Sequence, residues 1–224
     1  MIPGARIVML GRQGAGKGTQ CVRLARHYVV PHISTGDMLR AAVREGTEFG
    51  RKANEYMSAG ELVPDDVIIG VVDERLEKDD TRARGFILDG FPRTVPQAEA
   101  LMEISRPRGL DVVINLDVSL EVVMERIAAR RVCTECGTNY SVHAPPETDW
   151  TCDVCGGQVV QRPDDTEAAI RRRLDLYEQE TAPLLEWFAQ RDLLEVVNGC
   201  GSLDDITERL IRVIDERRAH YRTG

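Results

Sequence analysis

Short apolar runs alternate with longer stretches of helical periodicity along this sequence. The runs, bounded by turn residues, predict five strands at residues 6–10, 31–34, 86–89, 112–116 and 193–197. Apolar residues spaced three or four positions apart predict helices at residues 16–28, 65–79, 94–105, 119–131, 166–190 and 203–219. The alternation predicts an α/β fold, a doubly wound parallel sheet of about five strands flanked by helices on both faces.

Two stretches interrupt this alternation. Residues 36–63 predict two helices with no strand between them. Residues 132–163 contain four cysteines and three prolines and show little helical periodicity. Both stretches are therefore predicted to be insertions on a single core.

The composition excludes several classes of protein. Of the 224 residues, 42% are hydrophobic, which excludes wholesale disorder. The sequence has no run of about 18 apolar residues and no signal-peptide pattern at its start, so we expect a cytoplasmic protein without a membrane partner. The net charge of −8 argues against nucleic acid as a partner, because phosphate-backbone binding needs a basic surface.

A glycine-rich loop follows the first predicted strand. Residues 11–19, here called the phosphate loop, read GRQGAGKGT and fit the G-x-x-x-x-G-K pattern of a P-loop, with a predicted helix directly after it. Backbone N–H groups in such a loop form an anion site at the positive end of the helix dipole, and Lys17 can reach the β- and γ-phosphates. The loop predicts phosphate binding by Gly14, Ala15, Gly16, Lys17, Gly18 and Thr19.

An acidic residue ends another predicted strand. Asp89 closes the run FILD and precedes Gly90. An isolated aspartate at such a place is more often a turn or cap residue. Beside a phosphate loop, however, the carboxylate is predicted to hold Mg²⁺, usually through water.

Four of the six cysteines form two C-x-x-C pairs separated by fifteen residues, which are Cys133 with Cys136 and Cys152 with Cys155. This spacing predicts a structural Zn²⁺ site, because four thiolates fill the tetrahedral positions and leave none open for chemistry. Iron would suit the same four thiolates. A redox pair or a nucleic-acid-binding zinc ribbon is favoured by neither the context nor the charge. Cys21 and Cys200 are predicted to be core or loop residues.

Several segments resemble the adenylate kinase family in order and spacing: GRQGAGKGTQ, STGDMLRAAV (34–43), AGELVPD (59–65) and LDGFPRTVPQA (88–98). The match continues through RIAARRV, RPDD and RRRLDLYEQETAPL, and so covers essentially the whole chain. The combination of DGFPR with STGDMLR is specific to nucleoside monophosphate kinases. The cysteine-rich insertion resembles the long lid of bacterial-type members in its zinc-bearing form.

The resemblance implies the reaction MgATP + AMP ⇌ 2 ADP, carried out by a monomer whose partners are ATP, AMP and ADP. It divides the chain into a core (1–33, 64–128 and 166–224), an AMP-binding insertion (34–63) and a zinc-binding lid (129–165). The phosphate of AMP is already an anionic nucleophile, so no general base is required, and none of the four histidines matches a catalytic position of the family.

The resemblance also implies roles for particular residues. The implied catalytic residues are Lys17, Asp89, Arg93, Arg130, Arg162 and Arg173. The implied ATP-binding residues beyond the phosphate loop are Arg126, Arg130, Asn139, Tyr140 and Gly201. The implied AMP-binding residues are Thr35, Arg40, Glu61, Leu62, Val63, Gly90, Phe91, Pro92, Arg93, Gln97, Arg162 and Arg173. Guanidinium suits this work because its planar fork pairs with two phosphate oxygens at once.

The helical periodicity adds expectations about individual arginines. Arg126 and Arg130 are four positions apart on a predicted helix, so they are expected to share one face. Arg131, Arg171 and Arg172 are expected on solvated helix faces.

Two alternatives remain open. One is a nucleoside monophosphate kinase with another acceptor or with GTP as donor; in this family Thr35 and Gln97 weigh against UMP and CMP, whereas contacts to the donor base are sparse. The other is a non-catalytic protein that binds nucleotides or nucleic acid through a zinc ribbon. The complete arginine set with Lys17 and Asp89, together with the acidic charge, argues against it.

Overall fold

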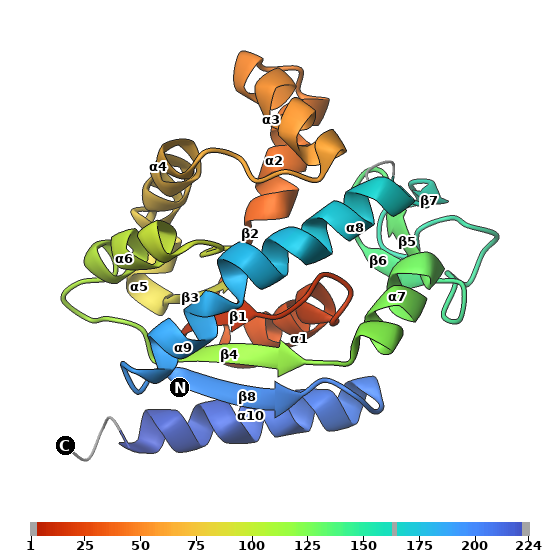
Figure 1. Ribbon diagram of the computed structural model, residues 1–224. Coiled ribbons are helices and arrows are strands. Elements are labelled where there is room, and N and C mark those ends of the chain that lie inside the picture. The colour runs from red at the N-terminus through yellow and green to blue at the C-terminus, as the bar shows by residue number, and fades with distance from the viewer. Residues whose placement is uncertain (1–3, 163–164, 221–224) are drawn as a thin grey trace.

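Five parallel strands form the central sheet of this computed structural model, which describes residues 4–162 and 165–220 (Figure 1). The strand order is β2-β3-β1-β4-β8. The bounds are β1 (Arg6–Leu10), β2 (His32–Ser34), β3 (Phe86–Asp89), β4 (Val112–Asp117) and β8 (Leu194–Asn198). The predicted parallel sheet is confirmed, and the bounds of each predicted strand agree with those of an observed strand to within one residue at both ends.

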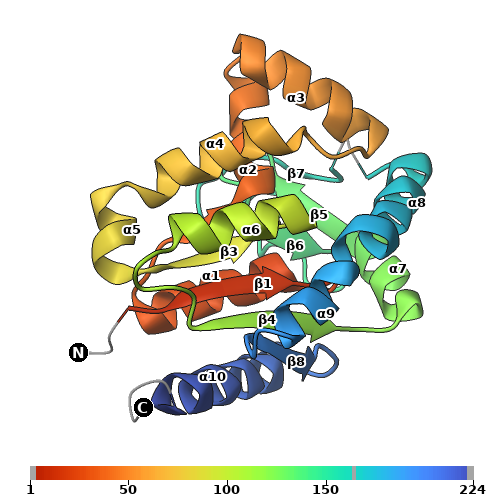
Figure 2. The ribbon, with the colours of Figure 1, turned by 60° about the vertical axis from the view of Figure 1, so that its left-hand side comes forward.

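Helices connect the strands and cover both faces of the sheet (Figure 2). Their bounds are α1 (Lys17–Tyr28), α2 (Thr35–Arg44), α3 (Glu48–Ala59), α4 (Asp65–Leu76), α5 (Asp79–Arg84), α6 (Val95–Ile104), α7 (Leu120–Ala129), α8 (Glu167–Leu176), α9 (Pro183–Ala189) and α10 (Leu203–His220). Side-chain oxygens of Ser34, Thr47, Thr94, Ser119 and Thr166 cap α2, α3, α6, α7 and α8 by accepting a backbone N–H of the first turn.

Alternate residues of β1 belong to two separate cores. Ile7 and Met9 pack with α1, α7 and α10 on one face, whereas Val8 and Leu10 pack with α4, α6 and α9 on the other. All four are at most 3% exposed. This is the expected outcome for a central strand, since successive side chains point to opposite faces of a sheet.

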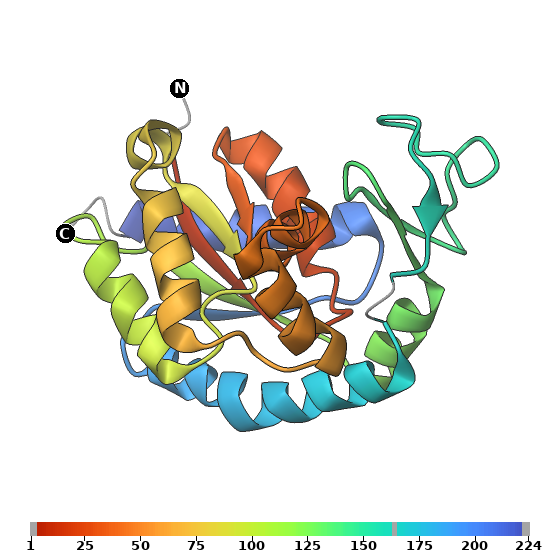
Figure 3. The same cartoon turned by 90° about the horizontal axis from the view of Figure 1, so that it is seen from above.

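The helix predicted over residues 166–190 is interrupted. A π-helical turn, η1 (Tyr177–Thr181), separates α8 from α9. Pro183, two residues after its end, has no N–H to continue the regular pattern of hydrogen bonds. The combined segment runs along one side of the molecule, from the cysteine-rich insertion toward the far end of the sheet (Figure 3). Similarly, the helix predicted over 65–79 ends at Leu76, and the sequence pattern did not reveal α5.

The cysteine-rich insertion contains a small antiparallel sheet that the sequence pattern did not reveal. Its strands are β5 (Arg130–Cys133), β6 (Asn139–Ser141) and β7 (Val159–Val160), in the order β6-β5-β7. Arg130 pairs with Ser141 and has extended backbone angles, so α7 ends at Ala129. The prediction that Arg126 and Arg130 share one helical face is therefore wrong, and Arg131 also lies on β5 rather than on a helix.

No helix in the described part of the chain combines the length and the apolar character needed to cross a membrane. Residues 1–3, 163–164 and 221–224, which belong to the predicted core and lid segments, lie outside the described residues.

Candidate active site

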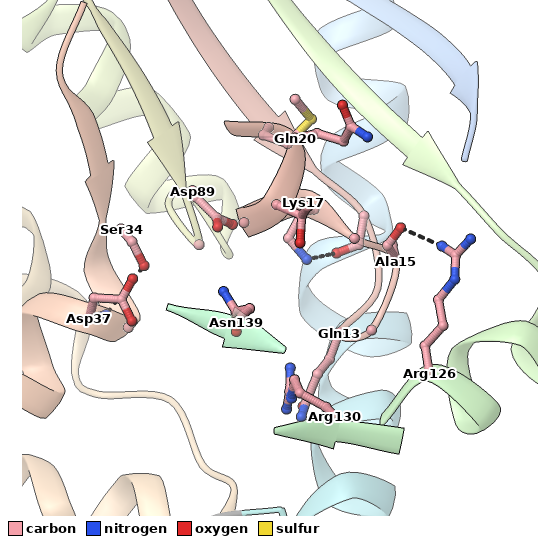
Figure 4. A pocket seen from close by; sticks show the side chains of 18 of the residues that line it. Gln13, Ala15, Lys17, Gln20, Ser34, Asp37, Asp89, Arg126, Arg130 and Asn139 are labelled. Atoms are coloured by element: carbon pink, nitrogen blue, oxygen red, sulfur yellow. Dashed lines mark hydrogen bonds between the residues drawn. The ribbon is translucent and has the colours of Figure 1, made fainter. Parts of the chain in front are cut away.

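A cavity of about 1080 Å³ opens where β1, β2 and β3 end (Figure 4). Its walls come from the phosphate loop, the first turns of α2, the end of α7, the cysteine-rich insertion and α8. All but one of the residues that were predicted to contact nucleotides line this cavity. The exception is Phe91, whose side chain is fully buried in the core against α4, α6 and α9. Doubly wound sheets bind their ligands at this edge.

Positive charge is concentrated in this cavity. Among the described residues that line it, nine are lysine or arginine and four are aspartate or glutamate, although the whole chain carries a net charge of −8. A cleft lined by one sign of charge focuses its field on a ligand of the opposite sign. The cavity is therefore suited to an anionic ligand.

The phosphate loop is shaped by glycines at positive φ, Gly11 among them. Gly14 has φ of +82° and Gly16 has φ of +100°. A Cβ on Gly14 would lie 2.9 Å from the carbonyl oxygen of Val123, so this position has no room for a side chain. The Lys17 ammonium donates to the Gly11 carbonyl at 2.6 Å and to the Arg12 carbonyl at 3.0 Å. Burial lowers the pKa of Lys17, and the nearby Asp89 carboxylate partly opposes this effect.

Asp89 lies at the end of β3 beside this loop. A Cβ on Gly18 would be 3.4 Å from the Asp89 carboxylate, which shows how closely the two approach. Burial by itself would raise the pKa of Asp89, but His32 and Lys17 outweigh it and the pKa is lowered. The side chain is therefore a carboxylate at neutral pH, as a magnesium ligand must be.

Arg162 brings a partly unsatisfied guanidinium to the cavity. Its Nη2 donates to Asn139 Oδ1 at 3.1 Å, whereas its buried Nε has no hydrogen-bond partner in the described parts of the chain. Burial and the neighbouring Arg40 and Arg130 lower the pKa of Arg162 to about 10. Buried polar groups are normally paired, so an unpaired donor among cations indicates a place for an anion.

Asp165 holds two of the predicted arginines and was not among the predicted site residues. Its side chain is fully buried. It accepts from Arg130 Nε at 2.9 Å and from Gln13 at 3.1 Å, and it lies 3.6 Å from Arg173 Nη1. The segment RPDD (162–165) was the available signal; its two middle residues lie outside the described part.

A second polar network fixes the Gln97 carboxamide. The Gln97 oxygen accepts from the Arg93 backbone N–H at 2.8 Å, and its amide nitrogen donates to Asp65 at 2.7 Å. Thr35 donates to the Gly90 carbonyl at 2.9 Å. Asp65 was not predicted as a site residue, although it ends the AGELVPD segment. One amide hydrogen and one oxygen lone pair of Gln97 remain for a ligand.

The remaining contacts connect distant parts of the chain. Arg126 donates to the carbonyls of Ala15 at 2.9 Å and Gly199 at 3.0 Å, and Figure 4 shows the first contact. Glu61 pairs with Arg172 at 2.7 Å, so Arg172 is partly exposed but not simply solvated. Arg171 is exposed, as expected, and pairs with Glu167.

The four paired cysteines form one cluster. Their sulfur atoms lie within 4.8 Å of one another, with 3.5 Å between Cys133 and Cys155 and 3.6 Å between Cys136 and Cys152. Thiolates at about 2.3 Å from a tetrahedral zinc ion are about 3.8 Å apart, so these residues fit Zn²⁺. The Tyr140 hydroxyl donates to Cys152 at 3.4 Å and lowers the pKa of that thiol to about 6. Tyr140 thus supports the cluster as well as lining the cavity.

Comparison with known proteins agrees with this geometry. A family profile described as "Adenylate kinase" matches residues 9–193. The chain is similar to the adenylate kinase of Thermodesulfovibrio yellowstonii, with 47% identity over 95% of this chain and 100% of the relative. It is 50% identical to the adenylate kinase of Bacillus subtilis over 89% of this chain and 93% of the relative, and 47% identical to that of Methanosarcina barkeri over 93% and 97%.

Proposed function

This chain belongs to the adenylate kinase family and is a phosphotransferase that interconverts MgATP and AMP with two ADP, and on this premise we propose how its residues divide the work. The main support for this proposal is the cluster of cations at the strand ends of an acidic chain, which includes the unpaired Arg162 Nε. Phosphoryl transfer depends mainly on alignment and on neutralising charge spread over the phosphate oxygens.

On the donor side, residues 14–19 hold the phosphates of ATP. Lys17 leaves the Gly11 and Arg12 carbonyls and turns to the β- and γ-phosphates. Arg126, next to Gly16 and Gly199, lies against the adenine. Asp89 would hold Mg²⁺, and the ion, when bound, would neutralise charge on the phosphates.

On the acceptor side, Arg40 and Arg93 hold the phosphate of AMP, while Thr35, Gln97 and the backbone of residues 61–63 recognise its base. The preset Gln97 carboxamide supports this choice, because it offers a donor and an acceptor side by side. The phosphate of AMP attacks in line without a general base. Arg130, Arg162 and Arg173 stabilise the charge of the transferring group, with Arg130 and Arg173 released from Asp165 as the phosphates arrive.

The lid, residues 129–165, and the AMP-binding insertion, residues 34–63, are proposed to close over the nucleotides and exclude water, which would otherwise accept the phosphoryl group. Zn²⁺ held by the four clustered cysteines stabilises the lid. A monomeric state and a cytoplasmic location complete the proposal.

A coupled assay of ADP formation tests these roles. MgATP is offered with AMP, CMP, UMP, GMP or no acceptor, and rapid turnover is expected with AMP alone. Lys17→Ala should abolish turnover, whereas Lys52→Ala, which removes an exposed cation of α3, should not. Turnover with CMP or UMP would overturn the role of Thr35 and Gln97, and GTP replacing ATP equally well would overturn the donor assignment.

A further inference from the structure

A second group of metal-ligating side chains lies beside the phosphate loop. Cys21 of α1, His32 of β2 and Asp89 of β3 each place one ligand atom within 4.8 Å of the other two. Because β2 and β3 are neighbouring parallel strands, with Ser34 level with Asp89, the sheet itself holds two of these three groups together.

His32 has an unused nitrogen directed at this group. Its Nε2 is buried and faces Asp89 Oδ2 at 3.8 Å, longer than an ordinary hydrogen bond, and it has no closer partner among the residues described. Buried ring nitrogens normally have a partner, and a neutral imidazole nitrogen is a common ligand of transition metals. His32 and Asp89 also line the cavity, which gives a cation a route to the site.

Cys21 supplies a soft ligand. Its thiol is free and completely buried. A cation that binds a cysteine displaces the proton of its thiol. Nitrogen and oxygen ligands at about 2.0–2.2 Å from a tetrahedral zinc ion are about 3.3–3.6 Å apart. The imidazole and carboxylate, 3.8 Å apart, therefore need to approach by only a few tenths of an ångström.

We propose that Cys21, His32 and Asp89 form an inhibitory site for a thiophilic divalent cation, with the fourth position open to the cavity. Binding converts Zn²⁺ and the Cys21 thiol into a zinc thiolate and a proton released to solvent. The thiolate and the Asp89 carboxylate neutralise the cation, and Lys17 loses its counter-charge. Inhibition rests on the proposed function, because the bound cation occupies the carboxylate that there holds hydrated Mg²⁺.

Zinc stoichiometry tests the site without reference to turnover. The full chain is equilibrated with Zn²⁺ in the absence of nucleotide, and bound metal per chain is measured by elemental analysis after dialysis. We expect Cys21→Ala and His32→Gln each to bind one ion fewer than the wild-type chain. Cys200→Ala, which removes an exposed thiol outside both clusters, is the matched control and should bind as the wild type does.

Zinc inhibition tests the consequence. At saturating Mg²⁺, Cys21→Ala should keep the basal rate, and half-inhibition should require at least about tenfold more Zn²⁺ than in the wild-type chain. Equal zinc stoichiometry in the wild-type chain, Cys21→Ala and His32→Gln would overturn the proposal. A different outcome would separate the two proposals. If the wild-type chain showed no turnover in zinc-free buffer but still bound one zinc ion more than the two variants, the proposed function would be overturned and the cation site supported.

Discussion

Replacing Asp165 by asparagine should destabilise the chain strongly. The side chain is fully buried, and its two guanidinium partners, Arg130 and Arg173, are 16% and 17% exposed. Asparagine keeps the shape but removes the only charge that this residue offers to them. Removing one partner of a buried ion pair costs about 3–5 kcal/mol, because the remaining charge stays buried without compensation.

The lower end of that range is the appropriate figure, since Arg173 also donates to the Met57 carbonyl and Gln13 can still bond an amide oxygen. A loss of about 3 kcal/mol lowers the melting temperature of a chain of this length by roughly 6–12 °C. Differential scanning calorimetry of the nucleotide-free protein measures this shift. The control is Glu167→Gln, which breaks an exposed ion pair with Arg171 and should change the unfolding free energy by less than about 0.5 kcal/mol.

If Asp165→Asn shifted the melting temperature no more than the control Glu167→Gln does, the reasoning would be refuted. It would mean that the two arginines are solvated or paired elsewhere, and that Asp165 does not hold them.

Other perturbations have equally definite outcomes. Gly14→Ala should abolish ATP binding in calorimetric titration, because its Cβ would meet a backbone carbonyl. Gly46 is also at positive φ but has open space around it. Gly46→Ala should therefore retain binding and cost only about 1–2 kcal/mol of unfolding free energy. Glu61→Arg should raise the KM for AMP, and adding Arg172→Glu should restore it by re-forming the ion pair with its charges exchanged. Burial would raise the pKa of Asp37, but Arg40 keeps it below the ordinary value. The contribution of Asp37 to stability is therefore present above about pH 4 and lost as pH falls through the folded-state pKa. In Asp37→Asn the denaturant midpoint should accordingly change less with pH in that range than in the wild-type chain. Removing the proposed lid zinc with a chelator should expose residues 130–160 to proteases, because the lid has few buried apolar residues besides its cysteines.

The sheet could be predicted from the sequence because its signals are local. Each strand is a short apolar run next to turn residues, and the order of runs and helical stretches indicates parallel pairing. The lid strands escaped prediction for the same reason, since β6 and β7 have three and two residues and form only by pairing with β5. That pairing also ends α7 at Ala129 and moves Arg130 off the helix.

The site residues that lie within sequence motifs could be predicted, whereas those contributed by distant parts of the chain could not. Almost every residue taken from the family segments lies around one cavity. Asp65 and Asp165, which orient Gln97 and Arg130, are ordinary aspartates until the fold brings them to their partners. Cys21 and His32 likewise become a candidate site only when α1 and β2 are placed beside β3.

The position of β1 between two cores has a consequence for changes in chain length. Deleting one residue from this strand would turn the side chains that follow to the opposite face and draw residues 11–19 back along the sheet by about 3.3 Å. Both cores and the phosphate loop would be lost together. The surface stretch 142–151, which joins the two cysteine pairs, is mostly exposed, and short-range bridges, a few hydrogen bonds and the contact of Trp150 with Arg131 tie it to its surroundings rather than a strand alternating between two cores. Insertions and deletions that survive selection should therefore collect there, and a library that varies segment length should keep folded members at that loop and none within β1.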